Sequence, residues 1–335
     1  MSKRQTALLG LASLATAAVT VTAGILPATR AIAGPTLNGA GATFPASIYE
    51  RWFAQYADKT GTKVNYQSVG SGAGIKQFIA GTVDFGASDA PMSEAEIAKV
   101  SRGVQQLPMT SGAIAVAYNQ PGCDLKLTQK QLADIFLGKI KNYSQVGCKA
   151  GPINVVRRSD GSGTTYNFTN SLAAFSPEWK KEVGVAKSVQ WPTGIGAKGN
   201  EGVSETIKRT KGGLGYIELS YAKEQNLVTA AIQNRAGQFV KPTAESAAAA
   251  LAEIDLGADL VESDPNPAGK GSYPIVSYTW ILAYKTGSGT KAIDLRKLFD
   301  YMISPAAQSQ APSIGYVAIP AKVQKQVKAA IRNIK

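Results

Sequence analysis

Three short segments of the chain combine glycine with hydroxyl side chains directly ahead of a helix-like stretch. They are GAGATFP at 39–45, GSGAG at 70–74 and RRSDGSGT at 157–164. The first N–H groups of a helix have no acceptor within the helix, and the helix dipole is positive there. Glycine lets the backbone approach an anion closely, while hydroxyl and guanidinium groups add donors that fit tetrahedral oxyanions. One such segment is commonly only a Ser or Thr helix cap. Three in one chain, one of them with Arg158, favour an anion-binding site.

Two aspartates accompany these donors, and they limit which anion can bind. Asp160 lies inside the third segment, and Asp89 follows a separate apolar stretch. A carboxylate repels a bound dianion unless the ligand carries a proton that the carboxylate can accept. Phosphate carries protons near neutral pH and sulfate does not, so such an aspartate would select phosphate over sulfate. We expect Asp89 to accept the ligand's proton and Asp160 to orient Arg158.

Alternating patterns along the chain predict the elements that position these segments. Apolar, β-rich stretches predict strands at 64–69, 114–118, 153–156 and 280–284. Helical spacing predicts helices at 46–59, 75–80, 93–100, 128–136, 164–175, 203–211, 244–253, 294–302 and 321–331. Residues 264–269 predict a loop. Strands that alternate with helices predict an α/β fold, in which helices cover the sheets.

The first residues are typical of an export signal. Lys3 and Arg4 precede an uncharged, apolar run over 6–25, and Ala31-Ile32-Ala33 forms an A-x-A cleavage pattern. We therefore expect residues 1–33 to be a cleaved signal peptide and the mature chain to begin near Gly34. The alternative is a membrane anchor that is retained, because the uncharged run is nearly long enough to span a bilayer. No cysteine follows the cleavage pattern, so a lipid anchor at that point is not expected.

The chain is basic, with a formal net charge of +13. The leader contributes three basic and no acidic residues, and removing those three charges leaves +10. Lysines and arginines are scattered and form no run of the kind that marks a nucleic-acid-binding arm, so no nucleic-acid partner is expected. A scattered basic surface is compatible with weak steering of small anions.

The two cysteines, Cys123 and Cys148, would reach an oxidising compartment if the chain is exported. Cysteine pairs are usually bridged there, so we expect a disulfide, which would stabilise the fold by roughly 3–4 kcal/mol. The alternative is a pair of free buried thiols. Two cysteines and no histidine do not favour a metal site.

Two other classes of function fit the residues less well. A hydrolase or phosphatase that uses Ser71 or Ser162 lacks the histidine of a catalytic triad, and neither serine lies in a G-x-S-x-G motif. A nucleotide-binding protein could use GIGAKG at 194–199, which fits G-x-G-x-x-G. No clear strand precedes that segment, so it is interpreted as a flexible glycine turn.

Several segments, in the same order along the chain, resemble the periplasmic phosphate-binding proteins of the phosphate-specific ABC transporter, a family of solute-binding proteins. They are GAGATFPA at 39–46, VNYQ-x-x-GS at 64–71, TVDFGASDAP at 82–91, VVRR-x-DGSGT at 155–164, WP-x-G-x-G-x-KGN at 191–200 and GYIE at 215–218. The resemblance implies a periplasmic monomer that binds inorganic phosphate and delivers it to the permease subunits of an ABC importer. It implies neither an enzyme nor a cofactor.

The resemblance also implies which residues bind phosphate. They are Thr43, Phe44 through its backbone N–H, Ser71, Asp89, Arg158, Asp160, Ser162, Gly163 and Thr164. Gly72 departs from the family pattern, since some members carry a second serine there. The cysteine pair is a further departure and is assigned no role in binding.

The fold implied by the resemblance is the two-lobed, type II periplasmic-binding-protein fold. Each lobe would be a mixed sheet flanked by helices, and two hinge crossings near 109–112 and 273–277 would let the lobes close on the ligand. Lobe I would comprise residues 34–110 and 275–335, and lobe II residues 111–274.

The motifs do not distinguish between the biological roles that a protein with this fold and ligand can have. A phosphate sensor, an extracellular scavenger or a receptor for another oxyanion would carry the same motifs. Arsenate has nearly the shape and protonation of phosphate and is expected to compete for the site, whereas sulfate is expected to compete poorly.

Overall fold

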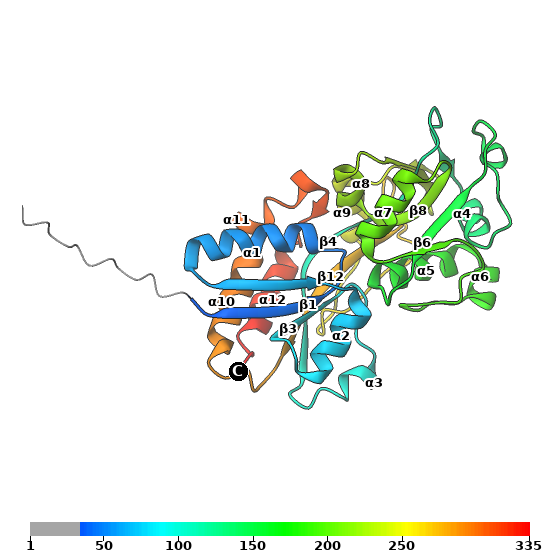
Figure 1. The fold of residues 1–335 in the computed structure, drawn as a ribbon. Coiled ribbons are helices and arrows are strands. Elements are labelled where there is room, and N and C mark those ends of the chain that lie inside the picture. Colours follow the sequence, from blue (N-terminus) through cyan, green and yellow to red (C-terminus); the bar gives the residue numbers. More distant parts are fainter. Residues whose placement is uncertain (1–33) are drawn as a thin grey trace, which may run out of the picture. The chain divides into compact units, whose positions relative to one another are not determined.

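One long antiparallel strand, β4 (Val104–Tyr118), joins two groups of strands in the computed structural model, which describes residues 34–335 (Figure 1). Its first part pairs with β12 (Val276–Tyr284) and its last part with β8 (Gly213–Glu218). The predicted signal peptide, residues 1–33, lies outside the described residues. The predicted α/β class is confirmed, because parallel strands alternate with helices on both sides of β4.

The first group contains strands from both ends of the described chain. β1 (Thr36–Gly41) lies parallel between β2 (Lys63–Ser68) and β3 (Phe85–Ser88), and β12 follows antiparallel between β3 and β4. The short β13 (Tyr316–Val317) pairs with β4 at Gly112 and Ser111. The beginning and the end of this part of the chain therefore contribute to one sheet.

The second group continues from the end of β4. β8 pairs antiparallel with β4, and β6 (Asn154–Arg158) and β7 (Ile195–Ala197) extend the sheet in parallel. β9 (Val228–Thr229) also pairs with β4. A separate small sheet contains β5 (Lys126–Leu127), β10 (Ala231–Gln233) and β11 (Phe239–Val240).

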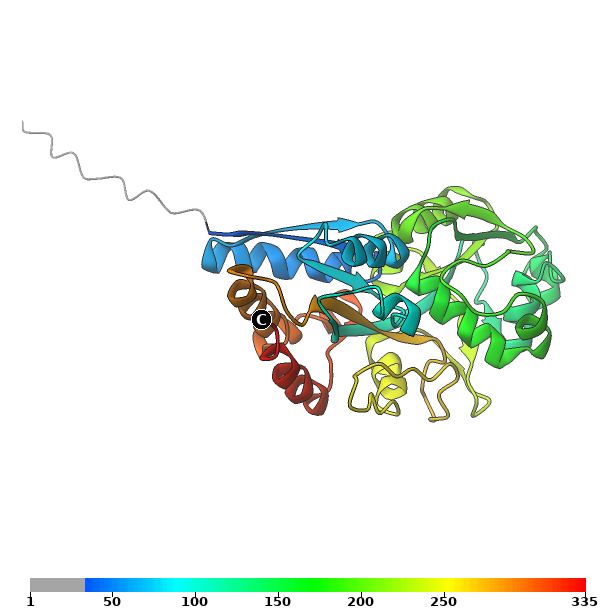
Figure 2. The same cartoon turned by 90° about the horizontal axis from the view of Figure 1, so that it is seen from below.

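Helices cover these sheets (Figures 1 and 2). α1 (Ala46–Thr60) packs on β2, α2 (Ser71–Ala80) on β1 and β3, and α7 (Gly199–Arg209) on β6 and β8. The other α-helices are α3 (Glu94–Ile97), α4 (Gln129–Phe136), α5 (Gly163–Phe175), α6 (Pro177–Glu182), α8 (Leu219–Glu224), α9 (Ala244–Leu251), α10 (Lys291–Met302), α11 (Pro305–Gln308) and α12 (Ala321–Ile331). Two 3-10 helices span Tyr143–Val146 and Pro312–Ile314.

The core forms where the predicted apolar faces meet. In α1, the helically spaced Ile48, Trp52, Phe53 and Tyr56 are all buried, as predicted. β4 is buried continuously from residue 107 to residue 118, because both of its faces are covered and it lies in the middle of the strand order.

Several element boundaries differ from the predictions. The prediction that 194–199 is a flexible glycine turn is wrong, because Ile195 pairs with Val156 of β6 and α7 begins at Gly199. α2 begins at Ser71, four residues earlier than predicted, so its first turn contains the glycine-rich segment. In each case the glycines belong to regular structure that tertiary packing stabilises, although their intrinsic helix or strand propensity is low.

The predicted disulfide between Cys123 and Cys148 is confirmed, with Cα atoms 5.4 Å apart. It connects the segment after β4 to the end of the 3-10 helix at Tyr143–Val146. The alternative of two free thiols is therefore wrong.

The predicted crossing at 109–112 falls inside β4, and the one at 273–277 leads into β12. The division into two lobes at these points stays a prediction. Within residues 34–335, no helix combines the length and the apolar character that a membrane crossing requires.

Candidate functional site

The three predicted segments meet where α1, α2 and α5 begin. Thr43 and Phe44 lie just before Pro45, the N-cap of α1. Ser71 is the first residue of α2, and Gly163 is the first residue of α5. The Ser71 hydroxyl oxygen accepts hydrogen bonds from the backbone N–H of Gly163 at 3.0 Å and of Asp89 at 3.2 Å. The second segment, the third segment and the end of β3 are thus in direct contact.

An asparagine connects the first segment to the third. Asn200, in the first turn of α7, is fully buried, and its Nδ2 donates to Thr43 Oγ1 at 2.8 Å and to Thr164 Oγ1 at 3.3 Å. Its backbone N–H also donates to Thr43 Oγ1, at 3.1 Å. Because Thr43 accepts both of these bonds, its own hydroxyl proton points elsewhere.

Arg158 and Asp160 form the predicted ion pair at the end of β6. Arg158 Nε donates to Asp160 Oδ1 at 2.7 Å, and Nη2 donates to Oδ2 at 2.5 Å. Burial opposes the charge of each partner, but the pairing outweighs it: the pKa of Arg158 lies above its usual value and the pKa of Asp160 below its own. The remaining nitrogen, Nη1, lies 3.4 Å from Thr164 Oγ1 and so faces the other predicted residues.

Asp89, just after β3, is the one predicted site carboxylate without an arginine bound to it. Its side chain accepts a hydrogen bond from Thr279 Oγ1 of β12 at 2.8 Å. Burial raises its pKa to about 7, although Thr279 and the charge of Arg158 act in the opposite direction. A carboxyl group with this pKa can hold or release a proton near neutral pH.

Among the backbone N–H groups of the site that find no acceptor within residues 34–335, three belong to completely buried residues. These residues are Phe44, Ser71 and Thr164. For Ser71 and Thr164 the cause is their position in the first turn of a helix. Buried N–H groups are almost always paired in folded proteins, so these three indicate a site for an external acceptor.

Ser162 and Gly163 complete the third segment. Ser162 caps α5 by accepting a hydrogen bond from the N–H of Thr165 at 3.0 Å. A Cβ atom on Gly163 would lie 2.6 Å from Ser71 Oγ and 2.7 Å from Asp89 Cβ, so only glycine fits there. Of the predicted residues, all but Asp160 are shielded from solvent, and a low local dielectric strengthens every polar contact among them.

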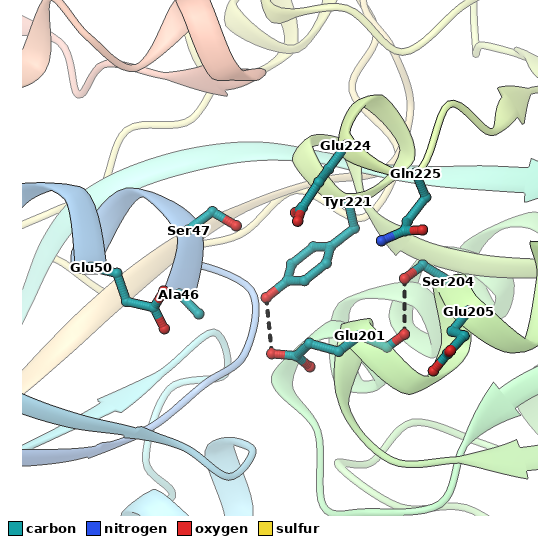
Figure 3. A pocket seen from close by; sticks show the side chains of 9 residues that line it. All are labelled: Ala46, Ser47, Glu50, Glu201, Ser204, Glu205, Tyr221, Glu224 and Gln225. Carbon is teal, nitrogen blue, oxygen red and sulfur yellow. Dashed lines mark hydrogen bonds between the residues drawn. The ribbon is translucent and has the colours of Figure 1, made fainter.

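Two tyrosines fix the backbone of the first segment. Tyr221 of α8 donates to the carbonyl of Thr43 at 2.7 Å, and Tyr316 of β13 donates to the carbonyl of Phe44 at 2.6 Å. The Tyr221 hydroxyl also lies 3.1 Å from Glu201 Oε1, as the close-up shows (Figure 3). The peptide between Thr43 and Phe44, which carries one of the unpaired N–H groups, is therefore held in place.

A pocket of about 430 Å³ lies beside this cluster, between α1 and the helices α7 and α8 (Figure 3). Four glutamates line it: Glu50, Glu201, Glu205 and Glu224. Burial, together with the charges of Glu201 and Glu224, raises the pKa of Glu50. This acidic pocket is unsuited to an anion, and the buried cluster remains the candidate site.

Several residues that organise the site were not predicted from the sequence. They are Asn167, whose Nδ2 donates to the carbonyl of Asp89, together with Asn200, Thr279 and the two tyrosines. Only Asn200 had a signal, since it ends the KGN motif at 198–200. No group of three or more potential metal-ligating side chains occurs in the part of the chain that the structure describes.

Comparisons with known proteins identify the family of this chain. Residues 26–306 match the PBP superfamily domain. The chain is 43% identical to phosphate-binding protein PstS of Haemophilus influenzae over 323 residues, which cover 92% of this chain and 95% of the relative. It is 42% identical to phosphate-binding protein PstS of Xylella fastidiosa over 311 residues, which cover 88% of this chain and 84% of the relative. The chain belongs to the PstS family.

A solved structure agrees with this family at the level of the fold. The high-affinity periplasmic phosphate-binding protein PfluDING, solved with phosphate bound at pH 8.5, superimposes with a TM-score of 0.74 at 21% sequence identity, covering 88% of this chain and 93% of its own. The mixed α/β periplasmic-binding-protein fold is thereby confirmed for this PstS family member. The relatives' names describe binding proteins and no enzyme.

Proposed function

We propose that this chain binds inorganic phosphate and delivers it to an ABC-type phosphate importer. One observation carries the proposal: backbone N–H groups that are buried and find no acceptor within residues 34–335 lie in one cluster with the Arg158 guanidinium and the buried carboxyl group of Asp89. The donors suit an oxyanion, and the carboxyl group suits an oxyanion that carries a proton. Membership of the PstS family and the names of the relatives support the same ligand.

In this proposal the predicted residues bind phosphate in three ways. The N–H groups of Phe44, Ser71 and Thr164 donate hydrogen bonds to its oxygens at the positive ends of three helices. Hydroxyl groups of the same segments add donors, and Arg158 contributes charge while Asp160 orients its guanidinium. Asp89 accepts the proton of the bound phosphate, which sulfate lacks.

The partners and the cellular location follow from the same proposal. Delivery to an importer requires permease subunits that receive the loaded protein, and the predicted signal peptide would place it in the periplasm. We also propose that the protein acts as a monomer. Rotation of the two predicted lobes about β4 and the start of β12 would open and close the site.

Titration calorimetry of residues 34–335 tests the proposal. The protein is first unfolded and refolded to remove bound ligand, and phosphate, arsenate and sulfate are then titrated separately. One-to-one binding of phosphate, competition by arsenate and no binding of sulfate are expected. Equal binding of phosphate and sulfate would contradict the role of Asp89, and absence of phosphate binding would overturn the proposed function.

A further inference from the structure

Glu218 is a buried carboxyl group that has no place among the predicted phosphate ligands. It is the last residue of β8, its side chain is fully buried, and its Oε2 accepts a hydrogen bond from the N–H of Ser220 at 2.7 Å. The other oxygen, Oε1, has no hydrogen-bond partner within residues 34–335. A Cβ atom on Gly112 would lie 3.2 Å from that oxygen and 3.3 Å from the ring of Phe44, so Glu218 lies next to the first phosphate segment.

A chain of hydrogen bonds leads from Glu218 to that segment. Glu218 Oε2 is bonded to Ser220 Oγ, which lies 3.0 Å from Tyr316 Oη, and Tyr316 in turn is bonded to the carbonyl of Phe44 at 2.6 Å. The carbonyl can only accept, so Tyr316 donates to it. Tyr316 must then accept from Ser220, which uses the single proton of that hydroxyl. The link between Ser220 and Glu218 therefore needs a proton that only Glu218 can supply.

The surroundings of Glu218 favour the same protonated state. The titratable groups that face it are Tyr316 from β13 and Tyr221 from α8, and both are neutral at physiological pH. No lysine or arginine in residues 34–335 forms an ion pair with it. Burial raises the pKa of Glu218 to about 8, although the hydrogen bonds from Ser220 act in the opposite direction.

The two tyrosines make the state of Glu218 relevant to the ligand. Tyr316 holds the carbonyl of Phe44 and Tyr221 holds the carbonyl of Thr43, so together they orient the peptide that carries the Phe44 N–H. If Glu218 lost its proton, Ser220 would donate its own proton to the carboxylate and no longer to Tyr316. The hydroxyl group of Tyr316 would then lose the hydrogen bond that holds it against the carbonyl of Phe44. The negative charge of ionised Glu218 would also lie next to the segment that binds the anion, and it would repel the anion.

We propose that Glu218 is a positioning residue for phosphate binding: as a neutral carboxylic acid it starts the hydrogen-bond chain that orients Phe44, and its ionisation weakens phosphate binding at alkaline pH. The inference rests on the proposed function, since it concerns the affinity of the same site. It adds a residue that does not contact the ligand but sets the pH range of binding.

The test is the pH dependence of phosphate affinity in three proteins. They are the wild type, Glu218→Gln, which is neutral at every pH, and Glu182→Gln as a matched control on the exposed surface of α6. Between about pH 7 and about pH 10, the wild type is expected to lose about tenfold more phosphate affinity than Glu218→Gln does, the effect of one pKa unit of coupling. The titrations of phosphate and of Asp89 affect all three proteins equally. They therefore cancel when the affinity of the wild type is divided by that of Glu218→Gln at each pH. Glu182→Gln is expected to follow the wild type.

Parallel pH profiles of the wild type and Glu218→Gln would overturn the inference while leaving the proposed function intact. Absence of phosphate binding in all three proteins would overturn both. Infrared spectroscopy gives a readout that does not depend on ligand: in an Asp89→Asn background, a carbonyl band of a protonated carboxylic acid should persist at neutral pH and titrate near pH 8. Its absence would overturn the inference even if Glu218→Gln failed to fold.

Discussion

The Oγ atom of Ser71 accepts a hydrogen bond from the N–H of Gly163 at 3.0 Å, although the two residues are 92 positions apart in the sequence. This bond brings the first turns of α2 and α5 against each other. It also consumes one of the free N–H groups of α5, so the next one, that of Thr164, remains for the ligand. The approach is close enough to exclude any side chain at position 163.

Replacing Gly163 with alanine should therefore weaken phosphate binding. The new methyl group would meet Ser71 and Asp89 and force α5 away from α2. Overpacking of this kind costs about 1–3 kcal/mol, which corresponds to roughly a tenfold to hundredfold rise in Kd. Calorimetry would measure the change. Gly202→Ala in α7 is the matched control, because a Cβ there meets nothing closer than 3.7 Å; equal effects of the two changes would contradict the steric argument.

Asp89→Asn should relax the discrimination against sulfate. The amide can donate to a sulfate oxygen, whereas the carboxylate leaves an acceptor facing an unprotonated anion. An unsatisfied acceptor costs about 1–3 kcal/mol, so the ratio of phosphate to sulfate affinity should fall by roughly tenfold to a hundredfold. Competition titrations with sulfate measure the ratio, and the same change at the exposed Asp58 should leave it unaltered. An unchanged ratio in Asp89→Asn would remove the proton-acceptor role from this residue.

The raised pKa of Asp89 also predicts how stability depends on pH. Between the ordinary aspartate value of about 4 and the folded value of about 7, the folded protein keeps a proton that the unfolded chain releases. The free energy of unfolding of the ligand-free protein should therefore fall as pH rises through this window, by up to about 4 kcal/mol from this group. Urea unfolding at several pH values measures the slope, which should be shallower in Asp89→Asn; identical slopes would refute the assignment.

Asp160→Asn should destabilise the protein strongly. Only 1% of the Arg158 side chain is exposed, and the change leaves its charge buried without a partner. Breaking a buried ion pair in this way costs about 3–5 kcal/mol. Because the pKa of Asp160 is lowered, its contribution is present above the unfolded pKa and is lost as pH falls through the folded pKa. Urea unfolding near neutral pH measures the loss, with Asp255→Asn, which breaks the solvent-exposed pair with Lys322, as the control with little expected effect.

The sequence predicted the α/β class, the presence of a helix after each of the three segments and the pairing of Arg158 with Asp160, because each is encoded locally. Glycine, hydroxyl and charged residues adjacent in sequence suffice to mark a helix N-terminus. The resemblance to a known family then suggested one ligand for all three. Boundaries were predicted less well where packing decides them, as at the start of α7, whose glycines carry little helix propensity.

The residues that orient the site could not be predicted from local pattern. Thr279 lies in an apolar strand and reaches Asp89 only because β12 pairs with β3. Tyr316 lies on a two-residue strand near the end of the chain and contacts Phe44 only because β13 pairs with β4. Their roles depend on strand order, and no spacing along the sequence encodes that order.

The position of β12 between β3 and β4 has a consequence for how the chain acquires its structure. β1, β2 and β3 come from the first part of the described chain, yet the strand that completes their sheet begins only at residue 276. Pairings between such distant segments form slowly, because the entropy of closing a long loop is lost before any contact forms. The sheet that contains β1, β2 and β3 is therefore completed only after most of the polypeptide has been made. A chain with this strand order becomes compact late, only after β12 can pair with β3 and β4.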